Sequence, residues 1–497
     1  MKNFIPKIML FGLLLMSLSS YADESLDFIT LDKETYRFYQ EGKWDSLILL
    51  GNEGLSQGFD YYYLRYRMGI AYYALENYSK AEKHFQKAHE FNRRDETLLT
   101  YLYYANLFLN RENRAAYYAR QIKPEKRREL TDFSDSFVEK VYLEAGLLGG
   151  DDLEKNGDLA RDWTDSTIYI ENQLSDNALY THSGIKFRLT PRLGLYTAVN
   201  YIRKKKINKY RYYTDLERDS IVDTEYTQDY YYSMIQEEKS FSSTVRQLQV
   251  YLKADLLLGR DWTLSPYLHY LNVGYRKFDV SYIAHEVSAI AYFDKLQDEY
   301  VYFDYIRNQY KFKRKDTSLN DYIVGISAVK HLDYFSFSLG ASVSRLNFND
   351  QLAMHAGVSY FPLGNLKLYG STNVSFYHQK NSETQKDSKI IFYQQAGVKV
   401  FPRLWLEGSF GTGGLENTYR ESAFVVYNVY DKIRYLLEAN MIIPLSEHVE
   451  LSLRYQFRAK ESSYLHYYND FMEKPVYNII DTPYNEQMII GGLTWNF

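Results

Sequence analysis

The stretch "FSFSLGASV", residues 335–343, alternates apolar and small polar side chains at every position. Successive side chains of a β-strand point to opposite faces, so this period of two predicts a strand with one apolar face. The same period recurs in "LKLYGSTNVSF" (366–376) and "VELSLRYQFR" (449–458). Each stretch has about the 9–11 residues that a tilted strand needs to cross a bilayer. We therefore expect transmembrane strands from residue 137 onward.

The connections between these stretches alternate in length. Six short turns are expected, at 189–194, 257–262, 331–335, 361–366, 401–405 and 443–449. Longer polar stretches, expected to be loops, lie between them at 205–242, 280–318, 379–388, 414–424 and 459–483. Short turns at one end and long loops at the other are typical of an outer-membrane β-barrel. The pattern predicts 14 strands, with 12 or 16 as alternatives because residues 137–175 are ambiguous.

The chain closes on "GGLTWNF", residues 491–497, with apolar residues or glycine at each odd position. Gly492, Trp495 and Phe497 fit a G-x-x-Φ-x-Φ pattern that resembles the C-terminal signal read by the barrel assembly machinery. That machinery is thus an expected partner. We expect this last strand to pair with the first one, because an open sheet edge is not tolerated in lipid.

Residues 30–122 have a helical period instead. The residues Gly69, Tyr72, Ala81, Phe85 and Ala88 fall at the spacing of the tetratricopeptide motif, in which small residues let two helices pack closely. Degenerate repeats are expected at 34–60 and 98–122. His84 and His89, five residues apart, are interpreted as surface residues.

These features predict an α+β multidomain chain: a signal peptide (1–22), a periplasmic repeat domain (23–122), a linker (123–136) and an outer-membrane barrel (137–497). The signal peptide is inferred from Lys2, Lys7, the apolar run that follows, and small residues before a cleavage site after Ala22. The expected location is the outer membrane of a Gram-negative bacterium.

Composition excludes several classes of function. The chain has no cysteine, so disulfides, thiol catalysis and thiolate metal sites are excluded. With 59 basic and 63 acidic residues it lacks the basic excess of a nucleic-acid binder. No catalytic or phosphate-binding motif occurs, so we expect no enzyme activity, no metal and no cofactor.

The strand alternation also predicts which charged side chains face the lumen of the barrel. These are Lys367, Lys399, Glu407, Glu450, Arg454 and Arg458. The run "RKKK" (Arg203, Lys204, Lys205 and Lys206) could contact phosphates of membrane lipids or simply extend a strand. The Tyr-rich segment 210–232 is interpreted as a binding loop or, preferably, as a rigid hairpin that continues the barrel wall.

A barrel that follows helical repeats resembles the exopolysaccharide-export porins and the surface lipoprotein assembly modulators. This resemblance implies a translocation channel whose repeats dock a substrate or partner and pass protein or polysaccharide into the lumen. The alternative is an accessory subunit that uses the barrel only as an anchor; an outer-membrane enzyme is the weakest hypothesis. A wide lumen would favour the channel, and a lumen filled by loops would favour the anchor.

Overall fold

The computed structural model describes residues 26–131, 133, 136–164, 166–259, 261–380, 386–469 and 475–497. The expected signal peptide lies outside these residues. Internal contacts divide the chain after Asn106 into two compact units, the second of which begins at Leu107.

Each expected repeat is a pair of helices. The pairs are α2 (Phe28–Gln40) with α3 (Trp44–Ser56), α4 (Tyr62–Ala74) with α5 (Tyr78–Phe91), and α6 (Glu96–Leu107) with α7 (Glu112–Ala119). The helices begin where the sequence offers caps: the carboxylate of Asp27 accepts hydrogen bonds from the amides of Ile29 and Thr30 at the start of α2. The sequence predicted that the repeats extend to residue 122. The internal contacts instead place α7 and the short α8 (Pro124–Arg127) in the same unit as the barrel.

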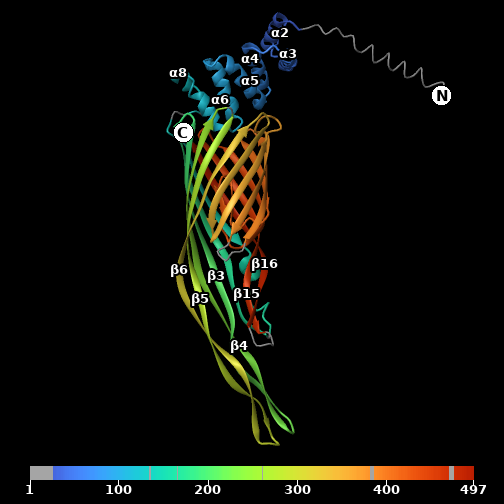
Figure 1. The fold of residues 1–497 in the computed structure, drawn as a ribbon, viewed down its shortest axis with the longest axis vertical. Coiled ribbons are helices and arrows are strands. Elements are labelled where there is room, and N and C mark those ends of the chain that lie inside the picture. The colour runs from blue at the N-terminus through green and yellow to red at the C-terminus, as the bar shows by residue number, and fades with distance from the viewer. Residues whose placement is uncertain are drawn as a thin grey trace, which may run out of the picture. The chain divides into compact units, whose positions relative to one another are not determined.

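The second unit is a closed antiparallel barrel of 14 strands, as the turn count predicted (Figure 1). Its wall runs, in order, β1-β16-β15-β14-β11-β10-β9-β8-β7-β6-β5-β4-β3-β2. The strand bounds are β1 (Val138–Gly150), β2 (Thr167–Thr190), β3 (Leu193–Asp223), β4 (Thr227–Leu258), β5 (Trp262–Asp294), β6 (Glu299–His331), β7 (Phe335–Leu346), β8 (Asn349–Tyr360), β9 (Leu368–Lys380), β10 (Lys386–Phe401), β11 (Leu404–Thr412), β14 (Lys432–Pro444), β15 (Val449–Asn469) and β16 (Pro475–Asn496). A short helix, α9 (Asp152–Asn156), follows β1.

Two ends of the barrel are distinguished by their connections. The six predicted short turns lie at one end, here called the short-turn end, where β1 begins and β16 ends. At the opposite, hairpin end, four strands extend far beyond the others as two paired hairpins (Figure 1). The expectation of loops at 205–242 and 280–318, and over most of 459–483, was therefore wrong. The preferred interpretation of 210–232, a hairpin that continues the barrel wall, is confirmed. β3 and β4 stay paired out to Asp223 opposite Gln228, because Tyr, Ile and Val favour strands over loops.

Closure of the wall rests on the pairing of the last strand with the first. β16 and β1 pair without interruption from Lys140 opposite Asn496 to Gly150 opposite Glu486. The amide of Phe497 adds a 3.0 Å hydrogen bond to the carbonyl of Glu139. Over residues 486–496 of β16, no edge is thus left open in this register.

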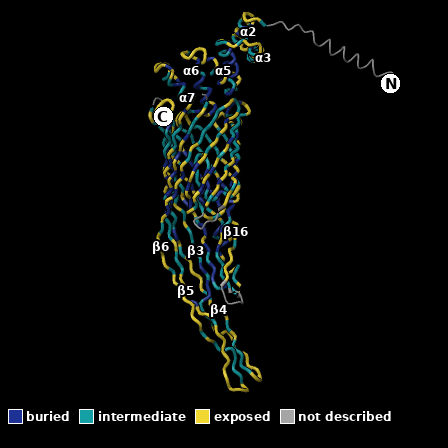
Figure 2. The backbone as a smooth tube through the Cα atoms, viewed as in Figure 1, coloured by how far each residue is buried: buried dark blue, intermediate teal, exposed yellow. Residues whose placement is uncertain are grey.

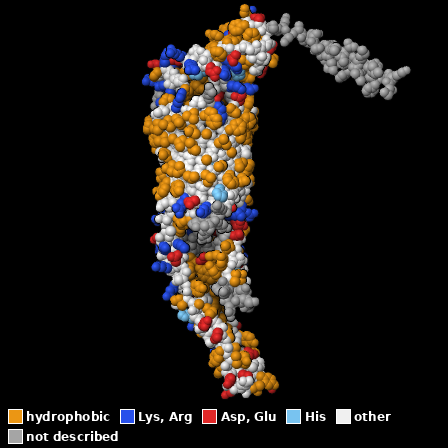
Figure 3. Space-filling view, viewed as in Figure 1, with side chains coloured by type: hydrophobic (Ala, Val, Ile, Leu, Met, Phe, Trp, Pro, Cys, Tyr) orange, Lys and Arg blue, Asp and Glu red, His pale blue; other side chains and the backbone are white. Residues whose placement is uncertain are grey.

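The barrel is apolar on its outer surface. Large side chains such as Leu339, Met354 and Ile489 are more than half exposed on the wall. Figure 3 shows hydrophobic atoms spread over much of the outer face of the barrel. Aromatic residues gather outward near the short-turn end, as in the girdles of membrane barrels; they include Phe137, Trp262, Phe335, Phe401, Trp495 and Phe497. Residues buried inside are Ser, Gln, His and Tyr to an unusual degree, and Figure 2 shows the buried positions alternating with exposed ones. An apolar outside around a polar inside places the protein in the outer membrane.

Among the residues described, no helix has the length and apolar character required to cross a bilayer.

Replacing Trp495 and Phe497 together by Ser should reduce the folded fraction in the membrane. Both rings are about half exposed on the lipid-facing side of the closing strand, at 53% and 49%. The change removes apolar surface there and alters the predicted assembly signal. The folded fraction is measured from heat-modifiable mobility on gels. Thr494→Ser, on the opposite face of the same strand, is the control, and equal folding of both variants would contradict the prediction.

Candidate functional site

The segment between β11 and β14 folds back into the lumen of the barrel. We call residues 413–431 the plug. It carries a small separate sheet of β12 (Thr418–Arg420) and β13 (Val425–Tyr427). Tyr419, Ala423 and Tyr427 are at most 3% exposed and pack in one cluster with side chains from the wall strands. The polar stretch 414–424 was predicted to be one of the long loops between strands; it forms part of the internal plug instead.

Wall side chains bind the backbone of the plug. The hydroxyl of Tyr377 donates to the carbonyl of Tyr419 at 2.6 Å, and that of Tyr251 donates to the carbonyl of Ser422 at 3.0 Å. Nδ1 of His269 donates to the carbonyl of Ala423 at 2.5 Å. These bonds satisfy backbone groups that would otherwise be buried without a partner, at a cost of about 1–3 kcal/mol each.

One ion pair fixes the plug to the wall. The guanidinium of Arg420 lies 2.8 Å from the carboxylate of Glu438 on β14 and 4.3 Å from the ring centre of Tyr393 on β10. The Glu438 carboxylate also accepts hydrogen bonds from Tyr393 and from Gln456 on β15. Because removing one member of a buried pair leaves an uncompensated charge, a substitution of Arg420 alone would destabilise the inserted plug.

The backbone of the plug is strained at its tip. Three consecutive residues, Glu421, Ser422 and Ala423, have positive φ values of 56°, 55° and 63°. Non-glycine residues in this left-handed region cost about 1–3 kcal/mol each and persist only where surrounding contacts hold them. At the plug's base Gly413 has φ +112°, and a Cβ there would lie 2.1 Å from the carbonyl of Ile390, so only glycine allows this turn into the lumen.

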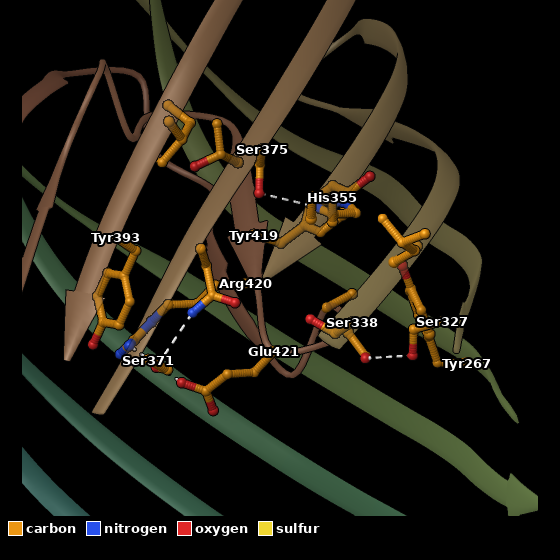
Figure 4. A pocket seen from close by; sticks show the side chains of 18 of the residues that line it. Tyr267, Ser327, Ser338, His355, Ser371, Ser375, Tyr393, Tyr419, Arg420 and Glu421 are labelled. Atoms are coloured by element: carbon orange, nitrogen blue, oxygen red, sulfur yellow. Dashed lines mark hydrogen bonds and ion pairs between the residues drawn. The ribbon is translucent and has the colours of Figure 1, made fainter. Parts of the chain in front are cut away.

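A cavity of about 230 Å³ with a mixed polar and apolar lining lies against the plug (Figure 4). Its lining includes four serines of the wall strands, Ser327, Ser338, Ser371 and Ser375. The first three lie three or four residues from the short-turn ends of their strands. The plug contributes Thr418 to Ala423 to the same lining. The lumen thus combines a filled section with a small cavity toward the short-turn end.

Helix α7 is bound at the short-turn end of the barrel. The carboxylate of Glu112 pairs with Lys140 of β1 and, at 2.7 Å, with Lys186 of β2. Burial raises the pKa of Glu112, and the two ammonium groups lower it by more, so this pKa lies well below its usual range. Glu112 is therefore ionised at any physiological pH.

Further contacts bind α7 and its flanking residues to the turns at the short-turn end. Arg114 pairs with Asp261 at 2.5 Å in the β4–β5 turn, and Arg111 donates to the carbonyl of Leu332 at 2.9 Å in the β6–β7 turn. These turns and β1 together span about half of the wall order. The helix that ends the predicted repeats is thus fastened to the rim of the barrel by charged groups.

The residues predicted to face the lumen have different positions. Glu407 accepts hydrogen bonds from Tyr369 at 2.6 Å and Asn440 at 2.8 Å, across the inside of the neighbouring strands. Other members make internal contacts: Lys399 lies over the ring of Trp405, Arg454 pairs with Glu144, and Arg458 with Glu486. Glu450 is half-buried on β15. Lys367 is exposed in the turn before β9, so its assignment to a strand face was wrong.

The run Arg203 to Lys206 does not act as one basic patch. β3 continues through it, so alternate side chains point to opposite faces. Lys204 pairs with the buried Glu486 at 2.5 Å and Lys206 donates to Gln173 at 2.8 Å. The predicted contact with lipid phosphates is therefore wrong for Lys204 and Lys206. Arg203 and Lys205 are exposed, and for them a contact with lipid phosphates stays a prediction.

The five repeat residues pack as the motif requires. Ala81, Phe85 and Ala88 are fully buried and Tyr72 is 7% exposed. A Cβ at Gly69 would lie 2.5 Å from the ring of Phe85, so only glycine permits this approach of α4 and α5. His84 is also buried, which contradicts its interpretation as a surface residue; it stacks on Tyr72 with ring centres 5.3 Å apart.

The chain was compared with protein families, curated proteins and solved structures. Residues 62–95 match the family model of the tetratricopeptide repeat. No curated protein is detectably similar to the chain.

Solved structures share only the general architecture. A FadL homologue from Pseudomonas aeruginosa has 8% identity and a TM-score of 0.41, over 74% of this chain and 91% of its own. A bacterial polysaccharide outer membrane secretin has 9% identity and a TM-score of 0.32, over 73% of this chain and 100% of its own. The second TPR of Spaghetti (RPAP3), bound to an HSP90 peptide, has 22% identity and a TM-score of 0.18, over 19% of this chain and 86% of its own. The barrel assignment therefore rests on the strand pairing and the apolar outer surface described above.

Gly69→Leu should unfold the repeats without affecting the barrel. The added side chain overlaps the Phe85 ring, and overpacking of this kind costs about 1–3 kcal/mol or more. Thermal unfolding followed by circular dichroism at the helical band should show a lower midpoint, while heat-modifiable gel mobility stays normal. Phe91→Leu, at a 54% exposed position of α5, is the control.

The repeats should also lose stability in mild acid. Burial, followed by the nearby charges of Arg65 and Lys83, lowers the pKa of His84 to about 3. The unfolded chain binds a proton near a pH of about 6.5, so stability falls as the pH drops from about 6.5 toward 3. His84→Gln should flatten the pH dependence of the helical unfolding midpoint between about pH 7 and 5. An unchanged slope in this variant would exclude His84 as the cause.

Proposed function

We propose that this protein is a gated translocation channel of the outer membrane, with its short-turn end in the periplasm. The observation that carries the proposal is the plug: a strained segment held in a polar lumen by side-chain contacts. Short turns face the periplasm in bacterial barrels, which supports the orientation. The helical repeats precede the barrel in the chain, at the strand end that opens on this side, and would lie in the same compartment.

The plug has the properties of a gate. It is one continuous segment, tethered at both ends to β11 and β14, so it can leave the lumen without breaking the wall. Its tip stores strain in three left-handed residues, and release of that strain offsets part of the free energy by which its hydrogen bonds favour the inserted position. Beside it, the serine hydroxyls of the cavity offer hydrogen bonds to a polar chain. A protein segment or a polysaccharide, both rich in polar groups, fits this lining.

The repeats would supply the cargo or the signal. Stacked helical repeats form surfaces that hold another polypeptide. The repeats are followed in the chain by α7, which is ion-paired to β1, β2 and the β4–β5 turn at the rim. In this proposal a periplasmic or outer-membrane partner engages the repeats and favours departure of the plug.

A second candidate function is that of an anchored accessory subunit. The filled lumen favours it, because an anchor needs a wall that does not leak. Here the plug would be a permanent part of the core, and the repeats alone would act, by holding a partner at the membrane. The two functions differ in whether the plug moves.

The Ser327→Cys/Ser422→Cys variant should lock the gate. The two hydroxyl oxygens lie 3.0 Å apart, one on β6 and one at the plug tip, and the chain has no other cysteine to compete. In planar bilayers we expect transient openings of the wild type in KCl, none in the oxidised variant, and their return on reduction. Replacing residues 415–430 by a short Gly-Ser linker should give a permanently open pore.

The matched control is Ser462→Cys/Thr482→Cys, whose hydroxyl oxygens lie 3.1 Å apart on neighbouring wall strands. It adds a disulfide to the wall without touching the plug, and should conduct like the wild type. If the wild type never opens and removal of the plug leaves the barrel closed, the channel is excluded and the anchored subunit is supported.

A further inference from the structure

The far end of the long hairpins concentrates negative charge. We define the hairpin tip as residues 215–238 of the β3–β4 hairpin and 283–307 of the β5–β6 hairpin. It contains thirteen Asp and Glu residues and three Lys and Arg residues, a net charge of −10, whereas the whole chain carries −4. The remainder of the protein is therefore net positive. A segregation of charge this strong creates a local field that attracts cations.

The two hairpins form one surface at the tip. Along the middle of their length β4 and β5 are not paired with each other, between Asp229 and Arg246 of β4. They pair again at the far end, with Thr227 opposite Asp294 and Asp229 opposite Tyr292. The amide of Lys295 also donates to the carbonyl of Tyr226 at 2.9 Å. The acidic groups thus lie on a connected sheet and not on two independent arms.

Many carboxylates of the tip lack a basic neighbour. Among the described residues, no Lys, Arg or His nitrogen lies within 4.0 Å of six exposed ones: Glu217, Asp219, Glu225, Glu286, Asp298 and Glu299. Their mutual repulsion is a cost to the folded hairpins that a bound cation would remove.

Exposed aromatic and aliphatic side chains lie among these carboxylates. Tyr226, Tyr300 and Tyr302 are 56%, 51% and 57% exposed, and Leu296 is 76% exposed. Figure 3 shows hydrophobic and acidic atoms intermingled at this end of the molecule. A solvated hairpin needs no such apolar surface, whereas a docking surface uses rigid tyrosines as contact area.

The tip's own basic residues show how this surface binds a cation. Lys295 pairs with Asp223 and also donates to the carbonyl of Thr224 at 2.6 Å. The guanidinium of Arg218 lies 5.0 Å from the ring centre of Tyr230. Lys and Arg are therefore held here by carboxylates and by aromatic faces, the two modes in which proteins recognise such side chains.

We propose that the hairpin tip is a docking surface for a cationic polypeptide, one whose Lys and Arg residues alternate with apolar ones. The unpaired carboxylates would bind the charges, and the tyrosines and Leu296 would bind the aliphatic stems. Phosphate-bearing ligands such as nucleic acids and anionic lipids are repelled by the same charges. A divalent metal is not supported, since within the described parts of the chain no three His, Cys, Asp or Glu residues are placed to share an ion. This inference is independent of whether the barrel conducts.

The test uses the full-length protein in detergent micelles and a fluorescent peptide of Lys, Arg, Leu and Ser, long enough to cross the tip. We compare the wild type with a charge variant, Asp219→Asn/Glu225→Gln/Asp298→Asn/Glu299→Gln, and with an aromatic variant, Tyr226→Ser/Tyr300→Ser/Tyr302→Ser. The matched control neutralises four exposed carboxylates elsewhere: Asp45→Asn/Glu53→Gln/Glu154→Gln/Glu447→Gln. Heat-modifiable gel mobility verifies that each variant is folded.

We expect the charge variant to raise the Kd for the peptide about tenfold or more and to show a shallower dependence on salt. The aromatic variant should also raise the Kd although its net charge is unchanged, and the control should stay within about twofold of the wild type. A peptide with Glu in place of Lys and Arg should not bind. Equal loss in the control variant, or full binding by the aromatic variant, would overturn the docking surface, because only unspecific attraction would then be left. Competition by millimolar Ca²⁺ at constant ionic strength would point to a metal site and would overturn it as well.

Discussion

The whole barrel depends on one constraint: backbone groups in lipid have no water to bind and must pair with each other. An open edge in a 14-stranded sheet would leave a row of unpaired amides and carbonyls along the full thickness of the membrane. The unbroken register between β1 and β16 removes that edge, and its last bond is made by the C-terminal residue itself. The aromatic girdle, the polar interior and the contacts of α7 with the short-turn end all require this closed wall.

Closure has a consequence for the inside of the wall. Every second side chain points into a lumen that is too wide for those side chains alone to fill. This protein fills it with its own chain, and the wall provides Tyr, His and Ser side chains whose polar atoms bind the plug. Polar contacts of this kind hold the plug in one place, yet they can be exchanged for contacts with water or cargo. An all-apolar core would not allow such an exchange.

The sequence predicted the features that local patterns determine, namely the strands, the turns and the repeat. It did not predict the positions of residues that depend on the closed barrel. The period of two, the six turns and the repeat residues around Gly69 and Phe85 are local signals, and the structure has them as expected. The plug could not be found this way, because its position depends on distant partners, such as Tyr251, which is 171 residues from Ser422. One signal was present: Ala423 to Val426 form an apolar run in a segment expected to be an external loop. Lys204 was misplaced for a related reason, since a strand that continues past the membrane keeps turning alternate residues inward.

The long hairpins also constrain the order in which the barrel is built. In the proposed orientation, with the short-turn end in the periplasm, every hairpin at the other end must pass through the membrane during folding. For β3–β4 and β5–β6 the passing segments carry thirteen carboxylates, which cannot enter hydrocarbon without a prohibitive loss of hydration. Spontaneous insertion into a sealed bilayer is thus blocked at these two hairpins. In that orientation both hairpins require a hydrated opening that persists until they have crossed.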